Sequence, residues 1–183
     1  MRRAFGAQPT VAQHLATEPD ALRGFEAVLR RSNRAAAFAL GFAVHRMDPD
    51  AAILHVAALL HDFAELLLWL HAPTLALRIA RMQRAEPTLR SAQAQRSVLN
   101  IELADLQQAL LRAWRLPEML VRIEDDRHAD TLQVKNVLLA VRVARHSARG
   151  WDDAALADDV SDIAALLNLG ETPTRTLLRQ IDG

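Results

Sequence analysis

Hydrophobic positions along the chain recur mostly with the spacing of an α-helix. Apolar residues return every three or four positions over long stretches, and Ala and Leu, which favour helix, are abundant. No stretch alternates between apolar and polar residues for long enough to predict a β-strand. We therefore predict an all-α protein. The predicted helices span residues 20–46 (as one helix or as two with a bend near Ser32), 50–70, 74–84, 88–113, 118–124, 132–149 and 153–167, with short ones at about 9–16 and after Pro173.

The segment 50–70, DAAILHVAALLHDFAELLLWL, is apolar on every side and predicts a helix buried at the centre of the protein. Its length would also suit a membrane span, which takes about 20 helical residues. However, His61, Asp62 and Glu65 interrupt it, and an ionised Asp in the middle of a bilayer is costly. A central helix of a soluble bundle is the better interpretation, with Trp69 and Trp114 filling space between helices.

Composition narrows the functional classes. The 22 basic and 22 acidic residues give a formal net charge of zero, so the chain has no overall positive field for holding a nucleic acid. The absence of cysteine excludes disulfides, thiolate metal sites and cysteine nucleophiles. The N-terminal residues lack the apolar core of a signal peptide, and residues 1–8 are expected to be irregular. We expect a single-domain cytoplasmic protein that binds neither nucleic acid nor membrane.

Three phrases resemble the HDOD branch of the HD phosphohydrolase superfamily. They are AALLHDFAELLL, at 57–68; LNIELADLQQALLRAWRLPEMLVRIEDDRH, at 99–128, which has Arg115 where the family usually has glycine; and NVLLAVRVARH, at 136–146. The resemblance covers about residues 20–165 of a single domain, 1–183, leaving 1–19 poorly matched and 166–183 as a C-terminal extension. It implies a helical bundle of the HD type, in which the helices that usually precede the HD core are missing or unrecognisable.

The resemblance also implies where a metal would bind. Catalytic HD enzymes hold a divalent ion with an upstream His, a His-Asp pair and a downstream Asp. Here the pair is His61-Asp62, but the upstream position falls at Arg31, Ser32 or Asn33, and the downstream Asp, expected near residues 140–142, is missing. The resemblance therefore implies at least two lost ligands.

Two interpretations of the remaining residues stay open. His61, Asp62 and His128, the remnant of a His-His pair, could form a residual site for an ion such as Mn, Fe or Mg, since three protein ligands and water suffice for some metal sites. In the interpretation that we favour, Asp62 accepts hydrogen bonds in a buried polar network and no cofactor is bound. We assign no catalytic residues.

The missing metal ligands guide the functional prediction. The resemblance implies bacterial signal transduction, and we predict a non-catalytic regulatory module that acts through contacts with a protein partner; a homo-oligomer is left open. The alternative is a divergent metal-dependent phosphohydrolase acting on a nucleotide or phosphate ester, with the row Arg78, Arg81 and Arg84 attracting the anion. A third hypothesis, a plain interaction scaffold, requires an apolar surface patch and no pocket near His61.

Overall fold

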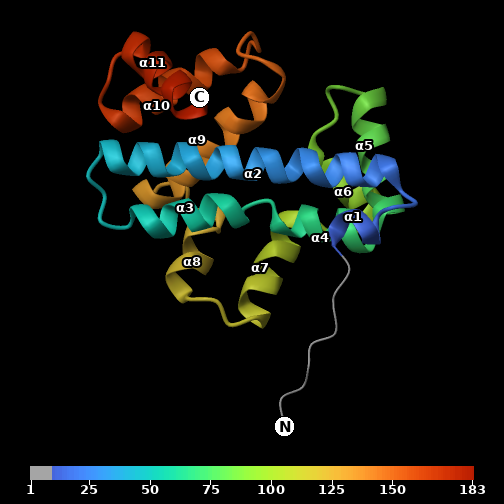
Figure 1. The fold of residues 1–183 in the computed structure, drawn as a ribbon. Helices are drawn as coiled ribbons and strands as arrows, with labels where there is room; N and C mark the ends of the chain where they lie inside the picture. The colour runs from blue at the N-terminus through green and yellow to red at the C-terminus, as the bar shows by residue number, and fades with distance from the viewer. Residues whose placement is uncertain (1–9) are drawn as a thin grey trace.

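The computed structural model describes residues 10–183, and every regular element in that part of the chain is a helix, which confirms the all-α prediction (Figure 1). The predicted irregular end, 1–8, and Pro9 lie outside the described residues. The helices are α1 (Val11–His14), α2 (Pro19–His45), α3 (Ala51–Leu60), α4 (Phe63–His71), α5 (Pro73–Ala85), α6 (Ser91–Leu99), α7 (Leu103–Ala113), α8 (Glu118–Ile123), α9 (Leu132–His146), α10 (Leu156–Leu167) and α11 (Glu171–Asp182), with 3-10 turns at Asp126–His128 and Ser147–Arg149.

The long helix α2 is the axis of the molecule. It crosses the whole width of the fold, with α10 and α11 on one side, α3 and α4 on the other, α9 packed against it between these two groups, and α5 and α6 near its N-terminal end (Figure 1). Pro19 occupies its first turn, where a missing N–H costs nothing, and Asp20 suits the positive end of the helix dipole. The helix continues through Ser32 without the bend that the sequence left open.

Small residues on α2 let its neighbours approach closely. Ala35, Ala36, Ala39 and Ala43 are all buried, and α3 packs against α2. His55 fixes the contact, because its Nδ1 lies 3.1 Å from the carbonyl oxygen of Ala36. The larger hydrophobic core forms around α2, α3, α9, α10 and α11.

The prediction of one buried helix over 50–70 is wrong. The segment is two helices that break at His61-Asp62, and much of it is only half-buried, with Val56 40% exposed. Residues 51–71 do have the length and hydropathy of a membrane span. In the fold, however, they pack as α3 and α4 against α2 and α7, and the break between them carries a paired carboxylate.

A buried amide on α7 stabilises this break. The Ala64 N–H donates to Gln107 Oε1 over 2.8 Å, and Gln107 Nε2 donates to the Leu60 carbonyl over 2.6 Å. One side chain thus satisfies a free donor at the start of α4 and a free acceptor at the end of α3. Because no Gly or Pro marks the position, the local sequence predicts a continuous helix, and a residue from another helix ends it.

A second, smaller core lies at the N-terminal end of α2, between α1, α4 and α5. Trp69 is its largest member and is only 7% exposed, which confirms its predicted core position. Gly24 makes room for it, since a Cβ at position 24 would lie 2.5 Å from the indole ring. The prediction for Trp114 is wrong: it is 50% exposed and meets the ring of Phe63 edge-on at 5.7 Å.

Two residues with positive φ lie at helix ends within or just after the predicted helix 88–113. Asn100, at φ 58°, ends α6, so the predicted helix over 88–113 is two helices. Arg115, at φ 55°, follows the end of α7. This left-handed conformation strains a residue with a side chain, which gives a physical reason for a glycine at that point of the Trp-x-Leu-Pro phrase.

Candidate functional site: a charged pocket at the break between α3 and α4

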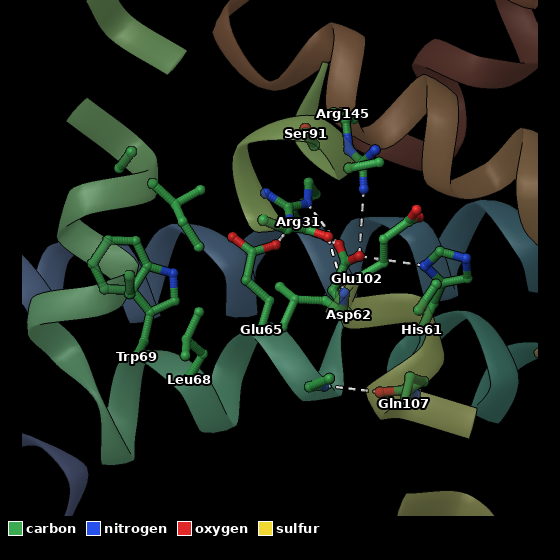
Figure 2. Close-up of a pocket in the computed structure, with 18 of the residues that line it drawn as sticks. Arg31, His61, Asp62, Glu65, Leu68, Trp69, Ser91, Glu102, Gln107 and Arg145 are labelled. Atoms are coloured by element: carbon green, nitrogen blue, oxygen red, sulfur yellow. Dashed lines mark hydrogen bonds and ion pairs between the residues drawn. The ribbon is translucent and has the colours of Figure 1, made fainter. Parts of the chain in front are cut away.

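A pocket of about 380 Å³ opens beside the break between α3 and α4. Side chains of α4, α5, α6 and α7 form its walls, and Arg31 of α2, Arg145 of α9 and Glu124 reach into it from other parts of the fold. Figure 2 shows Trp69 and His61 at opposite ends of the view, with Glu65, Arg31 and Asp62 between them. The pocket therefore has an apolar end near Trp69 and a charged end near His61.

Arg31 holds the centre of the charged end. Its Nε donates to Asp62 Oδ2 over 2.8 Å, and its Nη2 donates to Glu65 Oε2 over 2.7 Å (Figure 2). Its side chain is 17% exposed and that of Asp62 is 10% exposed, so water screens the pair only weakly. Although burial alone would lower the pKa of Arg31, the two carboxylates raise it, and the guanidinium is permanently charged.

Asp62 is surrounded by further cations. The Arg145 Nη2 donates to its Oδ1 over 3.4 Å, and the ring Nδ1 of His61 lies 3.3 Å from the same oxygen. Burial opposes ionisation of Asp62, but the hydrogen bond from His61 and the charges of Arg31 and Arg145 outweigh it and lower its pKa. Asp62 is therefore an ionised carboxylate with cationic groups on both oxygens.

His61 also contacts Asp126, whose Oδ1 lies 3.4 Å from its Nε2. Burial would lower the pKa of His61, but hydrogen bonds to Asp126 and Asp62 and the nearby carboxylates raise it to about 10. At neutral pH His61 is therefore an imidazolium, with both ring nitrogens donating. A metal ligand needs a neutral imidazole, so these contacts oppose that role.

Two buried polar groups that line the pocket have no hydrogen-bond partner. They are both oxygens of the Glu124 carboxyl group, in a residue only 5% exposed, and the indole N–H of Trp69. Burial raises the pKa of Glu124 to about 8, although the nearby charge of His61 and the amide of Gln107 oppose the rise. Buried polar groups are normally paired, so an unpaired acid and an unpaired donor in one pocket require an explanation.

The predicted metal ligands do not come together. His61 and Asp62 are adjacent, but the His128 side chain is 54% exposed, lies 3.5 Å from Asp125 Oδ2 and does not line the pocket. Within residues 10–183, no group of three or more His, Asp or Glu side chains is arranged to hold a metal ion. Because Arg31 also places a fixed positive charge on Asp62, these residues do not fit a divalent metal. The row of Arg78, Arg81 and Arg84 is exposed and lies outside the pocket lining.

Comparison with protein families gives a match to the HDOD domain over residues 7–129 of the 183. The chain belongs to the HDOD domain family. The match starts before the region 20–165 in which the sequence phrases showed the resemblance, and it ends before α9. It includes Arg31, His61, Asp62 and Glu124, and so covers most of the charged end of the pocket.

Two solved structures share this HDOD fold. A protein from Shewanella amazonensis SB2B, provisionally named a phosphohydrolase, superposes with a TM-score of 0.61 over 85% of this chain at 15% identity. A protein from Marinobacter aquaeolei VT8, provisionally named a signal transduction protein, does so with a TM-score of 0.59 over 83% of the chain at 17% identity. This chain spans only 58% and 37% of their respective lengths. A comparison with curated proteins found no match.

Sequence reasoning identified the His61-Asp62 pair in this HDOD domain but missed most of what surrounds it. Arg31 stood out only as a residue in the place of an expected ligand. Glu124 and Gln107 carried no signal, because each follows ordinary helical spacing in a stretch with many charged and polar neighbours. An acidic residue directly after Leu120 and Ile123, both buried, is the one local sign that Glu124 faces the interior.

Proposed function

We propose that this HDOD domain is a non-catalytic regulatory module of bacterial signal transduction that acts through contacts with a protein partner. The observation that carries the proposal is the ion pair of Arg31 with Asp62 and Glu65. A water-activating metal site needs carboxylate oxygens free to bind the ion, and here cationic side chains contact both oxygens of Asp62. The HD core then serves as a folded frame rather than as a hydrolase.

Electrostatics explains why Arg31 and a metal exclude each other. A divalent ion bound to Asp62 would lie within a few ångströms of the guanidinium, the imidazolium of His61 and Arg145. Like charges at about 4 Å repel by about 4 kcal/mol per pair of unit charges at an effective dielectric constant of 20. In the folded arrangement Arg31 supplies the positive charge that a metal ion would otherwise supply.

The similarity to a protein provisionally named for signal transduction supports this proposal. The name of the other relative favours the alternative, a metal-dependent phosphohydrolase acting on a nucleotide or phosphate ester. The pocket near His61 counts against a plain scaffold, which has no use for one. We also propose a cytoplasmic location, with neither nucleic acid nor membrane as partner.

Metal analysis separates the regulatory module from the phosphohydrolase. Purified protein would be incubated with Mn, Fe, Zn or Mg, desalted and analysed by mass spectrometry for metal content. We expect the wild type and Asp62→Ala to retain the same small amount of metal, well below one equivalent. We expect neither protein to hydrolyse bis(p-nitrophenyl) phosphate. Stoichiometric metal in the wild type that Asp62→Ala removes would overturn the proposal in favour of the hydrolase.

A further inference from the structure

The charges at the polar end of the pocket balance one another almost completely. Three cationic groups, on Arg31, Arg145 and His61, contact three carboxylates, those of Asp62, Glu65 and Asp126. A negatively charged ligand would therefore find no cation that lacks a carboxylate partner. Compensation within the network leaves no net positive charge to attract an anion.

The acidic groups that remain favour a cation. Glu124 is buried, and neither of its carboxyl oxygens makes a hydrogen bond of normal geometry, although the amide of Gln107 lies nearby. Glu102, the other acid of the lining, pairs with Arg96, which lies outside the pocket lining and is itself 59% exposed. Because burial raises the pKa of Glu124 to about 8, an ammonium group that enters the pocket near neutral pH would displace the Glu124 proton, and the resulting carboxylate would gain hydrogen bonds and an opposite charge beside that of His61.

The other end of the pocket suits an apolar body. Leu68, Trp69, Ala76 and Ile79 line it, and the largely buried Trp69 ring lies at this end of the pocket (Figure 2). The unpartnered indole N–H of Trp69 adds one donor for an oxygen of the ligand. Trp69 lies seven residues after Asp62 along α4, which is two turns or roughly 10 Å. A ligand that reaches both ends is therefore elongated.

We propose that this pocket binds a small, elongated organic amine whose ammonium group pairs with Glu124 and whose far oxygen accepts a hydrogen bond from Trp69. The pocket volume lies within the range of small-molecule sites. The inference rests on the proposed function, because a regulatory domain can bind a small molecule without converting it. Occupation of the pocket would give the two unpartnered groups their partners and would link α4 to Glu124 and to α5.

A matched series of probes tests the charge of the ligand on the wild-type protein. Tyramine, tyrosol and 4-hydroxyphenylacetate share one carbon frame and carry an amine, an alcohol and a carboxylate; 6-aminohexan-1-ol is a second amine with an oxygen at its far end. Binding is measured by calorimetry and by the ¹H–¹⁵N signals of the three tryptophan indoles, with Trp69→Phe assigning one of them. We expect the Trp69 signal to shift with both amines, and tyramine to bind at least about tenfold more tightly than tyrosol or the acid.

Two isosteric substitutions on α8 and directly after it sharpen the test. Glu124→Gln should weaken tyramine binding by about tenfold or more and leave tyrosol binding unchanged, since the amide keeps the shape of the side chain but cannot ionise beside the ammonium group. Glu118→Gln, at an exposed position outside the pocket lining, should change neither affinity. Trp69→Phe should bring the affinity for tyramine down to that for phenethylamine, which lacks the oxygen.

Three results would overturn the inference: no shift of the Trp69 signal with either amine at about 10 mM, equal or tighter binding of the carboxylate, or undiminished tyramine binding by Glu124→Gln. The wild-type series decides the charge preference even if a variant fails to fold. None of these results touches metal retention, so failure of this inference is distinguishable from failure of the proposed function.

Discussion

Two aspartates in this protein, one fully buried and one partly buried, have similar partners and different surroundings. Asp159, on α10, is fully buried; its Oδ2 lies 2.6 Å from His146 Nδ1 and its Oδ1 lies 2.8 Å from Arg142 Nη2, so it ties α10 to α9. Asp62 has an imidazole and two guanidinium groups around it and ties α2 and α9 to the break between α3 and α4. Only the Asp62 network opens onto a pocket.

The two aspartates distinguish charged groups that hold helices together from polar groups that can bind a ligand. The acidic stretch 152–162 contains at Asp159 a buried link between two helices. At that link both cationic partners reach the surface, with side chains 42% and 31% exposed. At the pocket, the Glu124 carboxyl oxygens and the Trp69 N–H are buried and make no hydrogen bond of normal geometry. A buried charge with cationic partners thus stabilises the packing of two helices, whereas polar groups without partners around a pocket indicate a ligand site.

The largest expected effect is that of removing Arg31. Arg31→Ala leaves Asp62 and Glu65 without their closest cation, and we expect the free energy of unfolding to fall by about 3 kcal/mol or more. Urea unfolding followed by circular dichroism measures it. The matched control is Arg30→Ala, since Arg30 is 69% exposed and its loss should cost within about 0.5 kcal/mol. Equal stabilities of the two variants would show that the ion pair of Arg31 does not stabilise the fold.

The second effect concerns the other aspartate. Asp159→Ala should lower the free energy of unfolding by about 2 kcal/mol, less than Arg31→Ala, because the abandoned Arg142 and His146 can turn to water. Ligand binding in the pocket should be unaffected. A loss larger than that of Arg31→Ala, measured in the same urea titration, would reverse the ranking of the two networks.

Two glycines of α2 should differ in how they tolerate a larger side chain, because Gly24 lies against Trp69 at the pocket and Gly41 lies against Ile181. Gly24→Ala places a Cβ 2.5 Å from the rigid Trp69 ring, and we expect it to destabilise by about 1–2 kcal/mol and to weaken binding of the amine probes. Gly41→Ala places a Cβ against the end of the Ile181 side chain, but this flexible side chain can rotate away, and the helix gains from alanine. Its stability should therefore stay within about 0.5 kcal/mol of the wild type. Thermal melts of both variants test the difference.

The smallest effect is a dependence of stability on pH. The pKa of Glu124 is raised from 4.5 to about 8, so between these values the unfolded chain loses a proton that the folded protein keeps, and stability falls as pH rises. His61, whose pKa is raised from 6.5 to about 10, contributes stability that is complete below pH 6.5 and is lost as pH rises through about 10. Glu124→Gln should remove the first part and raise Tm at pH 8 by about 3 °C.

Glu118→Gln is the control for this pH profile, because it should leave the shape of the wild-type curve intact. Melting curves recorded from pH 5 to pH 10 compare the three proteins. A wild-type Tm that rises between pH 5 and pH 8 would contradict the proposed state of Glu124.

Much of the fold was predictable from periodicity. The long helix α2, with its row of small residues, and the helices α5, α8, α9 and α10 follow the predicted ranges closely, because each buries one apolar face repeated at helical spacing. The breaks at His61 and Asn100 were not predictable in this way. The first depends on Gln107, 47 residues from the carbonyl that it contacts, and the second on a residue that tolerates the left-handed conformation without requiring it.

The features of the site also fall into those that the sequence determined and those that only the tertiary structure decided. The sequence by itself determined that the chain is helical, that His61 and Asp62 lie in its most apolar stretch, and that the expected upstream ligand is absent. Tertiary structure alone decided that Arg31, 31 positions away from Asp62, pairs with it, that Arg145 joins from 83 positions away, and that Glu124 is left without a partner. The physical reason is that local periodicity sets which face of a helix is buried, whereas the partner of a buried charge depends on which distant helix packs against it.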